Sequence, residues 1–436
     1  MKDSHNQQQG LAMLILVFMI ALAFTSYFVF GLSTEASKRN REERTAQALV
    51  NAKSALLGWS VAHPQYPGIM PFPDRSGDDL NYDGNSDCIN IAVTPLNYPH
   101  LIGRLPHATQ TLPCVGTLLN GLSGSFVDGD GESLWYAVSR NLIRPAGLPT
   151  LVINPSIINN PSFPWLIVRD KNGQIISNRV AAVVIAPGRV VGAQNRAGGL
   201  AGPAAYLDSV VVGGVPYSNA DDAIPNEDFI MAEDMQQVAN PHPVYAQPYQ
   251  FNDKLIYITI DELMSALEQR SIREARNALR AYYLASSANA VNRFYPYAAM
   301  LGDPNHACTE VTFAGTLPLD SALSTCTHPN VGMNAFLPNW FIESQWQEFM
   351  HYVLANDCSF AVPGCLTGGN ITVGAQVNVN ALLVSTGAAL VGQVRPSNNL
   401  VDYLDSVENT DGDNVFDAVG TVLTNIYNDQ MLIVEP

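Results

Sequence analysis

The sequence has little charge, and positive charge is especially scarce. Only 14% of the 436 residues are charged, and 22 Lys and Arg stand against 39 Asp and Glu, which gives a net charge of −17. A general nucleic-acid-binding protein needs clusters of basic residues that release counterions from the phosphate backbone. We therefore expect no nucleic-acid partner for this chain.

Recurrent catalytic motifs are missing as well. The eight histidines show no H-E-x-x-H spacing, and no Gly-rich phosphate loop follows a predicted strand. The segment Gly121–Ser125 lacks the final glycine of G-x-S-x-G, and a flexible loop is enough to explain it. The sequence predicts a protein that is not an enzyme.

The six cysteines form no C-x-x-C pair, which argues against zinc and thioredoxin-like sites. Of the 15 pairings that six cysteines allow, neighbours in sequence favour Cys88–Cys114, Cys308–Cys326 and Cys358–Cys365. Three such bridges indicate an oxidising compartment such as the periplasm or the cell exterior. Unpaired buried thiols remain the alternative.

The N-terminal region contains a long stretch without charge. It runs from Leu11 to Thr34 and follows the short polar segment Gln7-Gln8-Gln9-Gly10. At about 1.5 Å per residue this stretch is roughly 36 Å long, enough to cross the ~30 Å hydrocarbon layer of a membrane. The sequence predicts a transmembrane helix over 11–34. A plain signal anchor and a cleaved secretory signal, whose apolar region is usually only about 7–15 residues long, stay open as alternatives.

The same helix is expected to continue beyond the apolar stretch. No proline occurs between Leu11 and His63, and Pro64 then stops the helical pattern. The second half carries an apolar stripe at helical spacing, formed by Leu49, Ala52, Leu56 and Trp59. We expect one long helix over 11–63 whose second half packs against a globular domain.

The remainder of the chain shows an internal repeat. Tyr206–Val210 (Tyr-Leu-Asp-Ser-Val) recurs identically as Tyr403–Val407. Similar segments occur in the same order around both: amphipathic helices at 52–56 and 275–279, Tyr-Pro corners at 66–67 and 295–296, aromatic helices at 134–138 and 349–353, strands at 181–192 and 381–392, an arginine at 196 and 395, and Asn-Asp before strands at 255–259 and 431–434.

This order predicts two tandem α+β heads, 64–262 and 263–436, each with a helix on an antiparallel sheet and long loops. The second head would use the helix 258–288. The repeated pentapeptide itself is interpreted as structural, because its Asp and Ser can supply turn hydrogen bonds.

These segments carry a resemblance to a known family. Residues 7–34 resemble the leader and N-terminal helix of type IV pilins and type II secretion pseudopilins. Residues 67–74 and 131–139 resemble the large minor pilin-like proteins of Gram-negative bacteria. The resemblance implies that a prepilin peptidase removes the leader 1–10 after Gly10 and that Leu11 is then N-methylated. It implies other pilin or pseudopilin subunits as partners.

The resemblance also implies a location and a place in the filament. The subunit would cross the inner membrane once, with its C-terminal region in the periplasm, and then move to a filament at the cell surface. Major pilins carry a glutamate five residues past the cut, whereas this chain has Ile15. A subunit without that carboxylate cannot neutralise a neighbour's terminal amine in an apolar core, so we expect a place at the filament tip or in the initiation complex. A signal-anchored periplasmic scaffold or binding protein is the alternative, and adhesion, DNA uptake, secretion and motility are not distinguished.

Two acidic loops are candidate calcium sites. Oxygen-bearing side chains alternate along the chain as they do in an EF-hand loop. The first loop contains Asp79, Asn81, Asp83, Asn85 and Asp87, and the second contains Asn409, Asp411, Asp413 and Asp417. Asp128, Asp130 and Glu132 form a third cluster. A solvated Asp/Asn/Gly turn without a metal is the alternative for each.

Overall fold

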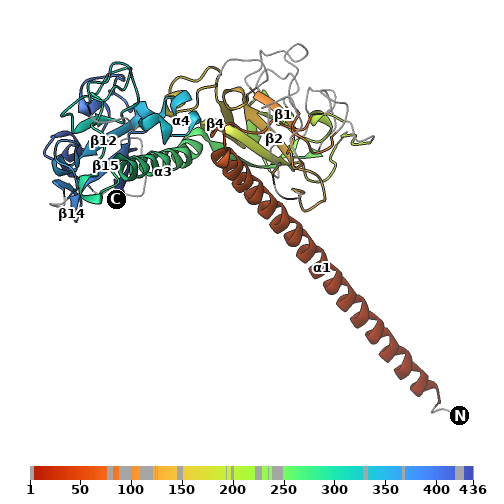
Figure 1. Ribbon diagram of the computed structural model, residues 1–436. Coiled ribbons are helices and arrows are strands. Elements are labelled where there is room, and N and C mark those ends of the chain that lie inside the picture. Colours follow the sequence, from red (N-terminus) through yellow and green to blue (C-terminus); the bar gives the residue numbers. More distant parts are fainter. Residues whose placement is uncertain are drawn as a thin grey trace.

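The computed structural model shows a mixed α+β protein with a long N-terminal helix and several antiparallel sheets (Figure 1). It describes residues 4–75, 82–87, 100–108, 121–122, 124, 126–144, 151–192, 194–197, 201–220, 228–233, 235–237, 249–327, 332–365, 369–417 and 427–435. Within the N-terminal helix, it describes the side chains of residues 16–22 and of residues from 35 onward.

The N-terminal helix α1 runs from Ser4 to Ala62. The prediction of one long helix ending before Pro64 is confirmed, because a proline cannot continue the helical hydrogen-bond pattern. Leu49, Ala52 and Leu56 of the predicted stripe are buried in the main hydrophobic core. Figure 1 shows the N-terminal part of α1 extending away from the rest of the protein, while its C-terminal end lies against the first sheet.

The membrane-span prediction is not decided by this helix. Among the side chains that the structure describes, no helix is long and apolar enough to cross a membrane. Residues 11–15 and 23–34 of the predicted span lie outside that set.

The first sheet has six strands. These are β1 (His100–Arg104), β2 (Trp135–Ser139), β4 (Ile175–Ala186), β3 (Leu166–Asp170), β7 (Phe229–Met231) and β10 (Lys254–Thr259). The long strand β4 organises the sheet, because its first half pairs with β3 and its second half pairs with β2 and β10, all antiparallel. β3 also pairs with β7 in parallel. α1 packs against β10 and β4.

The second sheet consists of β11 (Ala314–Thr316), β12 (Met350–Leu354), β15 (Ala381–Ser385) and β17 (Gln430–Val434), all antiparallel and in that order. Its order corresponds to β1-β2-β4-β10 of the first sheet. A small sheet beside it contains β13 (Ile371–Val373), β14 (Gln376–Val379) and β16 (Val415–Phe416). There β13 pairs with β16 in parallel, as β3 does with β7.

Helix α3 (Ile260–Ser286) connects the two sheets and packs on β17 and β15 of the second. The predicted helix 258–288 is therefore confirmed to within two residues at each end. It begins directly after β10, where the Thr259 hydroxyl accepts a hydrogen bond from the Glu262 N–H at 3.1 Å. Asp261 and Glu262 in its first turn complement the helix dipole.

Short elements complete the described part of the chain. They are the hairpin β5 (Ser209–Val212) and β6 (Val215–Ser218), the pair β8 (Gln236–Gln237) and β9 (Tyr249–Gln250), helix α4 (Asn339–Glu343) and several 3₁₀ turns, among them η2 (Pro155–Ile158). The main core is continuous from α1 through the first sheet and α3 to the second sheet.

Two predictions at the centre of the sheets are wrong. The segments 134–138 and 349–353, predicted as aromatic helices, form the strands β2 and β12. All five residues of each strand are buried, so the apolar run has no alternation that would distinguish a strand from a buried helix. The predicted strands 181–192 and 381–392 are also too long, because the chain leaves the sheet after Ala186 and Ser385.

Candidate functional site

The predicted processing site lies in the N-terminal helix. Gly10 and Leu11 fall within α1, where only the backbone is described. The structure therefore gives the conformation of this segment and leaves its cleavage as a prediction.

The first acidic loop uses its described carboxylates to hold its own backbone. Asp79 and Asn81 lie outside the described residues. Asp83 accepts hydrogen bonds from the backbone N–H of Asn85 at 2.7 Å and from the Asn85 side-chain amide at 2.6 Å. The buried Asp87 accepts one from the Arg75 backbone N–H. The contact between Asp83 and the Asn85 N–H is typical of an Asx turn, and Asp87 attaches the loop to the preceding segment at Arg75.

The second acidic loop brings its predicted residues together. Asn409 Oδ1 accepts a hydrogen bond from the Asp417 N–H at 2.8 Å, and Asp411 accepts one from the Asp413 N–H at 3.2 Å. Desolvation raises the pKa of the neighbouring Glu408, and the negative charges of Asp411, Asp413 and Asp417 raise it further. The acidic side chains are therefore close enough to repel one another, which is the condition that a bound cation would relieve.

The ligand geometry of a metal site is not complete in either loop. Within the described residues, no group of three or more His, Cys, Asp or Glu side chains is arranged to hold a metal ion. Calcium sites also draw on Asn and carbonyl oxygens, and Asp79 and Asn81 are outside the described set. Calcium binding at the two loops stays a prediction.

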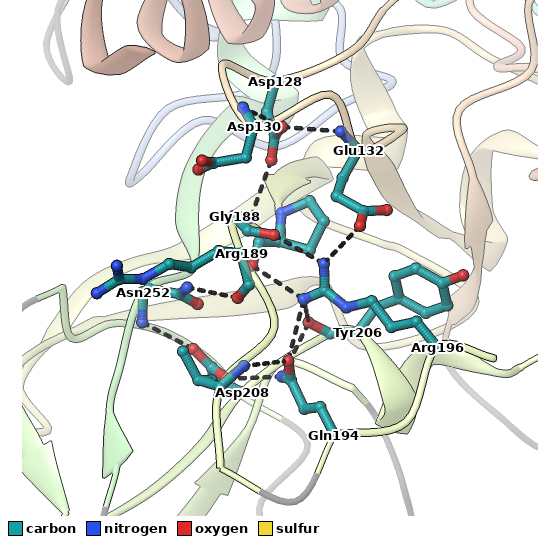
Figure 2. Close-up of polar contacts among 12 residues, drawn as sticks. Asp128, Asp130, Glu132, Gly188, Arg189, Gln194, Arg196, Tyr206, Asp208 and Asn252 are labelled. Atoms are coloured by element: carbon teal, nitrogen blue, oxygen red, sulfur yellow. Dashed lines mark hydrogen bonds and ion pairs between the residues drawn. The ribbon is translucent and has the colours of Figure 1, made fainter. Parts of the chain in front are cut away.

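The third cluster, at Asp128, Asp130 and Glu132, has a structural role (Figure 2). Asp128 Oδ1 accepts hydrogen bonds from the backbone N–H groups of Asp130 and Glu132, both at 2.9 Å. Asp128 Oδ2 accepts one from the Gly188 N–H at 2.9 Å. Burial raises the pKa of the Asp128 carboxyl. This side chain closes its own loop and attaches it to the end of β4.

An arginine connects this loop to the repeated pentapeptide. Arg196 Nη1 donates to the Gly188 carbonyl at 2.7 Å and lies 3.0 Å from Glu132 Oε1. Its Nη2 donates to Gln194 Oε1 at 3.0 Å and to the Tyr206 carbonyl at 3.1 Å. The guanidinium also lies 4.9 Å from the centroid of the Tyr206 ring. Figure 2 shows Arg196 at the meeting point of these segments.

The aspartate of the pentapeptide extends the network to the start of β10. Asp208 accepts hydrogen bonds from Gln194 Nε2 at 2.9 Å and from the Asn252 N–H at 2.7 Å, and its own N–H donates to Asp253 Oδ2 at 2.8 Å. Desolvation raises the pKa of Asp208 to about 7 and that of Asp253 well above its usual range. We call this set, Gln194, Arg196, Tyr206, Asp208, Asn252 and Asp253, the first arginine junction.

The second half of the chain contains the same network. The second arginine junction consists of Gln393, Arg395, Tyr403, Asp405, Asn428 and Asp429. Arg395 donates to the Gly387 carbonyl at 2.8 Å and to the Tyr403 carbonyl at 3.1 Å. Asp405 accepts from Gln393 Nε2 at 3.0 Å and from the Asn428 N–H at 2.6 Å.

Both junctions join the end of a central strand to the start of the edge strand beside it. The contacts fit the structural interpretation of the repeated pentapeptide, and the arginines at 196 and 395 and both Asn-Asp pairs belong to the same networks. Sequence reasoning missed Gln194 and Gln393. Both lie two residues before the arginine, so the repeated Gln-x-Arg spacing was the available signal.

Two of the predicted disulfides are confirmed. Cys308 is bonded to Cys326, and Cys358 is bonded to Cys365. Cys88 and Cys114 lie outside the described residues. Such bridges are typical of proteins that fold outside the cytoplasm.

Comparisons with known proteins give no further assignment. No family model, no curated protein and no solved structure matches this chain.

Proposed function

We propose that this chain is a non-enzymatic minor pilin or pseudopilin subunit at the tip or in the initiation complex of a type IV pilus or type II secretion-like filament. The observation that carries the proposal is helix α1. Its second half is anchored in the core of the first sheet, and its first half extends away from the rest of the protein as a continuous helix (Figure 1). This arrangement fits a helix whose second half packs in a head and whose first half contacts lipid or other subunits.

The exposed apolar side chains of α1 support a second environment for its first half. Leu16, Phe18 and Met19 are 61%, 63% and 64% exposed. Apolar surface in water costs about 25 cal/mol per Å², and contiguous exposed apolar surface usually marks a membrane or protein contact. Lipid before assembly and sister subunits afterwards would provide that contact. The proposed span is 11–34, with a single pass through the inner membrane.

The remainder of the chain would form two tandem heads, 64–262 and 263–436. The shared strand order, the parallel side pairs and the two arginine junctions all support a duplication. The two disulfides support a periplasmic location of the heads before assembly and a surface location afterwards.

The proposed position at the tip rests on Ile15. After cleavage, the amine of Leu11 would need a carboxylate from another subunit, because a bare ammonium in an apolar environment is costly. A subunit with isoleucine at this position cannot return that contact, so it suits an end of the filament. Gold labelling of the heads on isolated filaments tests the position, and labels along the whole shaft would contradict it.

The processing step is tested by determining the N-terminus of the membrane-purified protein. We expect the wild-type chain to begin at an N-methylated Leu11, and the Gly10→Leu variant to begin at Met1 and to be absent from filaments. Gly31→Ala, a glycine change in the same helix, is the matched control and should be processed normally. A wild-type chain that begins at Met1 would instead favour the signal-anchored scaffold.

Calcium at the acidic loops belongs to the same proposal. The crowded carboxylates at 411–417 would be neutralised by the ion, which would hold the exposed turn at 411–413. We expect a chelator to lower the thermal midpoint and added calcium to restore it. The variant Asp413→Asn should weaken this response, and an unchanged midpoint would remove calcium from the proposal.

A further inference from the structure

A polar cavity lies where α1 leaves the first head. Its volume is about 350 Å³, and one wall is the stretch of α1 between Glu35 and Thr45. The other wall is formed by the end of β4, the residues that follow it and the start of β10, where Lys254 lies opposite Ala186. The cavity is therefore at the end of the head from which the N-terminal part of α1 extends away (Figure 1).

The wall formed by α1 is held in place by the loop 128–132. The Gly129 N–H donates to the Thr45 hydroxyl at 2.9 Å, and Arg41 Nη1 lies 3.2 Å from Asp130 Oδ1. Gly129 lies so close to α1 that an added Cβ would clash with the Arg41 carbonyl oxygen. The cavity is therefore formed before any ligand enters, and its volume is in the range of small-molecule sites, about 300–1,000 Å³.

Four basic and four acidic side chains line the cavity. They are Lys38, Arg41, Arg189 and Lys254, and Glu35, Glu42, Asp130 and Glu233. Three pairs of opposite charge are already formed, Arg41–Asp130 at 3.2 Å, Lys254–Glu233 at 2.6 Å and Lys38–Glu42 at 3.8 Å. Arg189 and Glu35 remain, and in the part of the chain that the structure describes neither side chain has a hydrogen-bond or ion-pair partner. Both residues are exposed, so a ligand can reach them.

The second head lacks the basic residues of this cavity. The Arg189 carbonyl accepts a hydrogen bond from Asn252 Nδ2 at 2.7 Å, and the Ala388 carbonyl accepts the equivalent bond from Asn428 Nδ2 at 2.8 Å. Arg189 therefore corresponds to Ala388, and by the same alignment Lys254 corresponds to Gln430.

The shared junction forms without these cations. Figure 2 shows the Arg189 side chain pointing away from the first arginine junction. The basic side chains are thus specific to the head beside α1, and the fold that both heads share does not explain them.

The position of the cavity along α1 places it at the surface of the proposed membrane span. With residues 11–34 in the hydrocarbon layer, a rise of about 1.5 Å per residue puts Glu35 about 2 Å and Lys38 about 6 Å beyond its edge. The headgroup layer on each side of a bilayer is about 5–8 Å thick. The first residues of the cavity wall then lie among the lipid headgroups.

We propose that this cavity binds the headgroup of a membrane phospholipid, and that this headgroup is phosphoethanolamine. Arg189 donates to the phosphate, whose oxygens fit the fork of a guanidinium. Glu35 accepts a hydrogen bond from the ammonium group. Each unpaired charge of the cavity thus meets a group of opposite charge on one ligand. This inference goes beyond the filament proposal and rests on its membrane span, 11–34.

The test is native mass spectrometry of the full chain in a nonionic detergent, titrated with phospholipids that share their acyl chains and differ in headgroup. We expect a 1:1 complex with phosphatidylethanolamine. Phosphatidylcholine, whose quaternary ammonium has no N–H, and phosphatidylglycerol, which has no ammonium group, should each bind about tenfold more weakly. A tenfold change is the size expected for one lost charge-assisted hydrogen bond.

Three variants assign the contacts to residues. Arg189→Gln should weaken binding of all three lipids about tenfold, because each of them carries a phosphate. Glu35→Gln should remove the preference for phosphatidylethanolamine over phosphatidylcholine. Arg39→Gln changes an exposed arginine of α1 that does not line the cavity, so it should leave binding unchanged.

The proposal is overturned if the three lipids bind the wild type alike, or if Arg189→Gln and Arg39→Gln behave alike. It is also overturned if soluble phosphoethanolamine binds as tightly as the lipid, which would make a free phosphate compound the ligand. Alkaline washing of membranes separates this result from the proposed function. A chain that stays in the membrane and shows no headgroup preference refutes the site alone, whereas a chain released without detergent refutes the span and the site together.

Discussion

Glu268 on α3 provides the sharpest test of the packing between this helix and the second sheet. Its side chain is 4% exposed and accepts a hydrogen bond from Gln430 Nε2 of β17 at 2.9 Å. Desolvation raises the pKa of Glu268 from 4.5 to about 8, and the charge of Asp429 contributes to the increase. A carboxyl group of this kind is held protonated in the folded protein at neutral pH.

The sign and size of the effect on stability follow from this raised pKa. Below pH 4.5 the group is protonated in the folded and in the unfolded chain, so its contribution to folding is complete. Between pH 4.5 and 8 only the folded chain retains the proton, and the free energy of unfolding falls by about 1.4 kcal/mol per pH unit. The shift of about 3.5 units gives an upper value of about 5 kcal/mol above pH 8.

We therefore expect Glu268→Gln to stabilise the protein at high pH and not at low pH. The glutamine keeps an oxygen for the hydrogen bond from Gln430 but has no charge to desolvate. Thermal midpoints of the full chain in detergent are measured at pH 4.5 and pH 8.5. The variant should exceed the wild type by several degrees at pH 8.5, since roughly 2–4 °C per kcal/mol applies to a domain of this size.

The half-exposed Glu274 on the same helix supplies the control. Glu274→Gln should change the midpoint by a similar small amount at both pH values. Comparing each variant with the wild type at the same pH removes the contribution of the other buried carboxyls. A Glu268→Gln midpoint equal to the wild type at pH 8.5, or a difference of equal size at both pH values, would refute the reasoning.

Three further sets of substitutions test other parts of the fold, each by the free energy of unfolding. Arg395→Lys should destabilise by about 2–4 kcal/mol, because an ammonium cannot reproduce the forked contacts of the guanidinium; a loss under about 0.5 kcal/mol, the size of ordinary surface changes, would remove the proposed importance of the junction. Gly315→Ala should destabilise by about 1–3 kcal/mol, because the added Cβ would clash with the backbone oxygen of Ala299. Gly58→Ala, with open space around its Cβ, should be neutral or stabilising. Replacing Cys308 and Cys326 by serine should cost about 3 kcal/mol from loop entropy, and a midpoint that does not respond to reductant in the wild type would contradict it.

The sequence predicted the helices and the edge strands β10 and β17 better than the central strands of the two sheets. The C-terminal end of α1 and the strands β10 and β17 follow from local signals: Pro64 after the helix, and short apolar runs after Asn-Asp. The central strands β2 and β12 were assigned to helices, because burial on both faces removes the alternation on which a strand prediction depends.

Candidate sites made of residues close in sequence could be predicted, and sites made of residues far apart in sequence could not. Cys358–Cys365 and the Asx turns involve near neighbours in sequence, and both could be anticipated. A cavity of about 620 Å³ lined by Asn159, Thr316 and Tyr403 depends instead on Thr316 lying opposite His351 and on a loop more than 150 residues earlier. No local pattern gives such a register, so the cavity could be found only from the folded structure.

The junction between β10 and α3 has a mechanical consequence. Thr259 is both the last residue of β10 and the N-cap of α3, so no flexible linker separates the first sheet from α3. A force on the second sheet would be transmitted along α3, which is roughly 40 Å long, to β10, the strand that packs against α1. The two sheets and α3 would therefore move as one rigid unit under force, and extension of the chain would have to begin with the separation of paired strands.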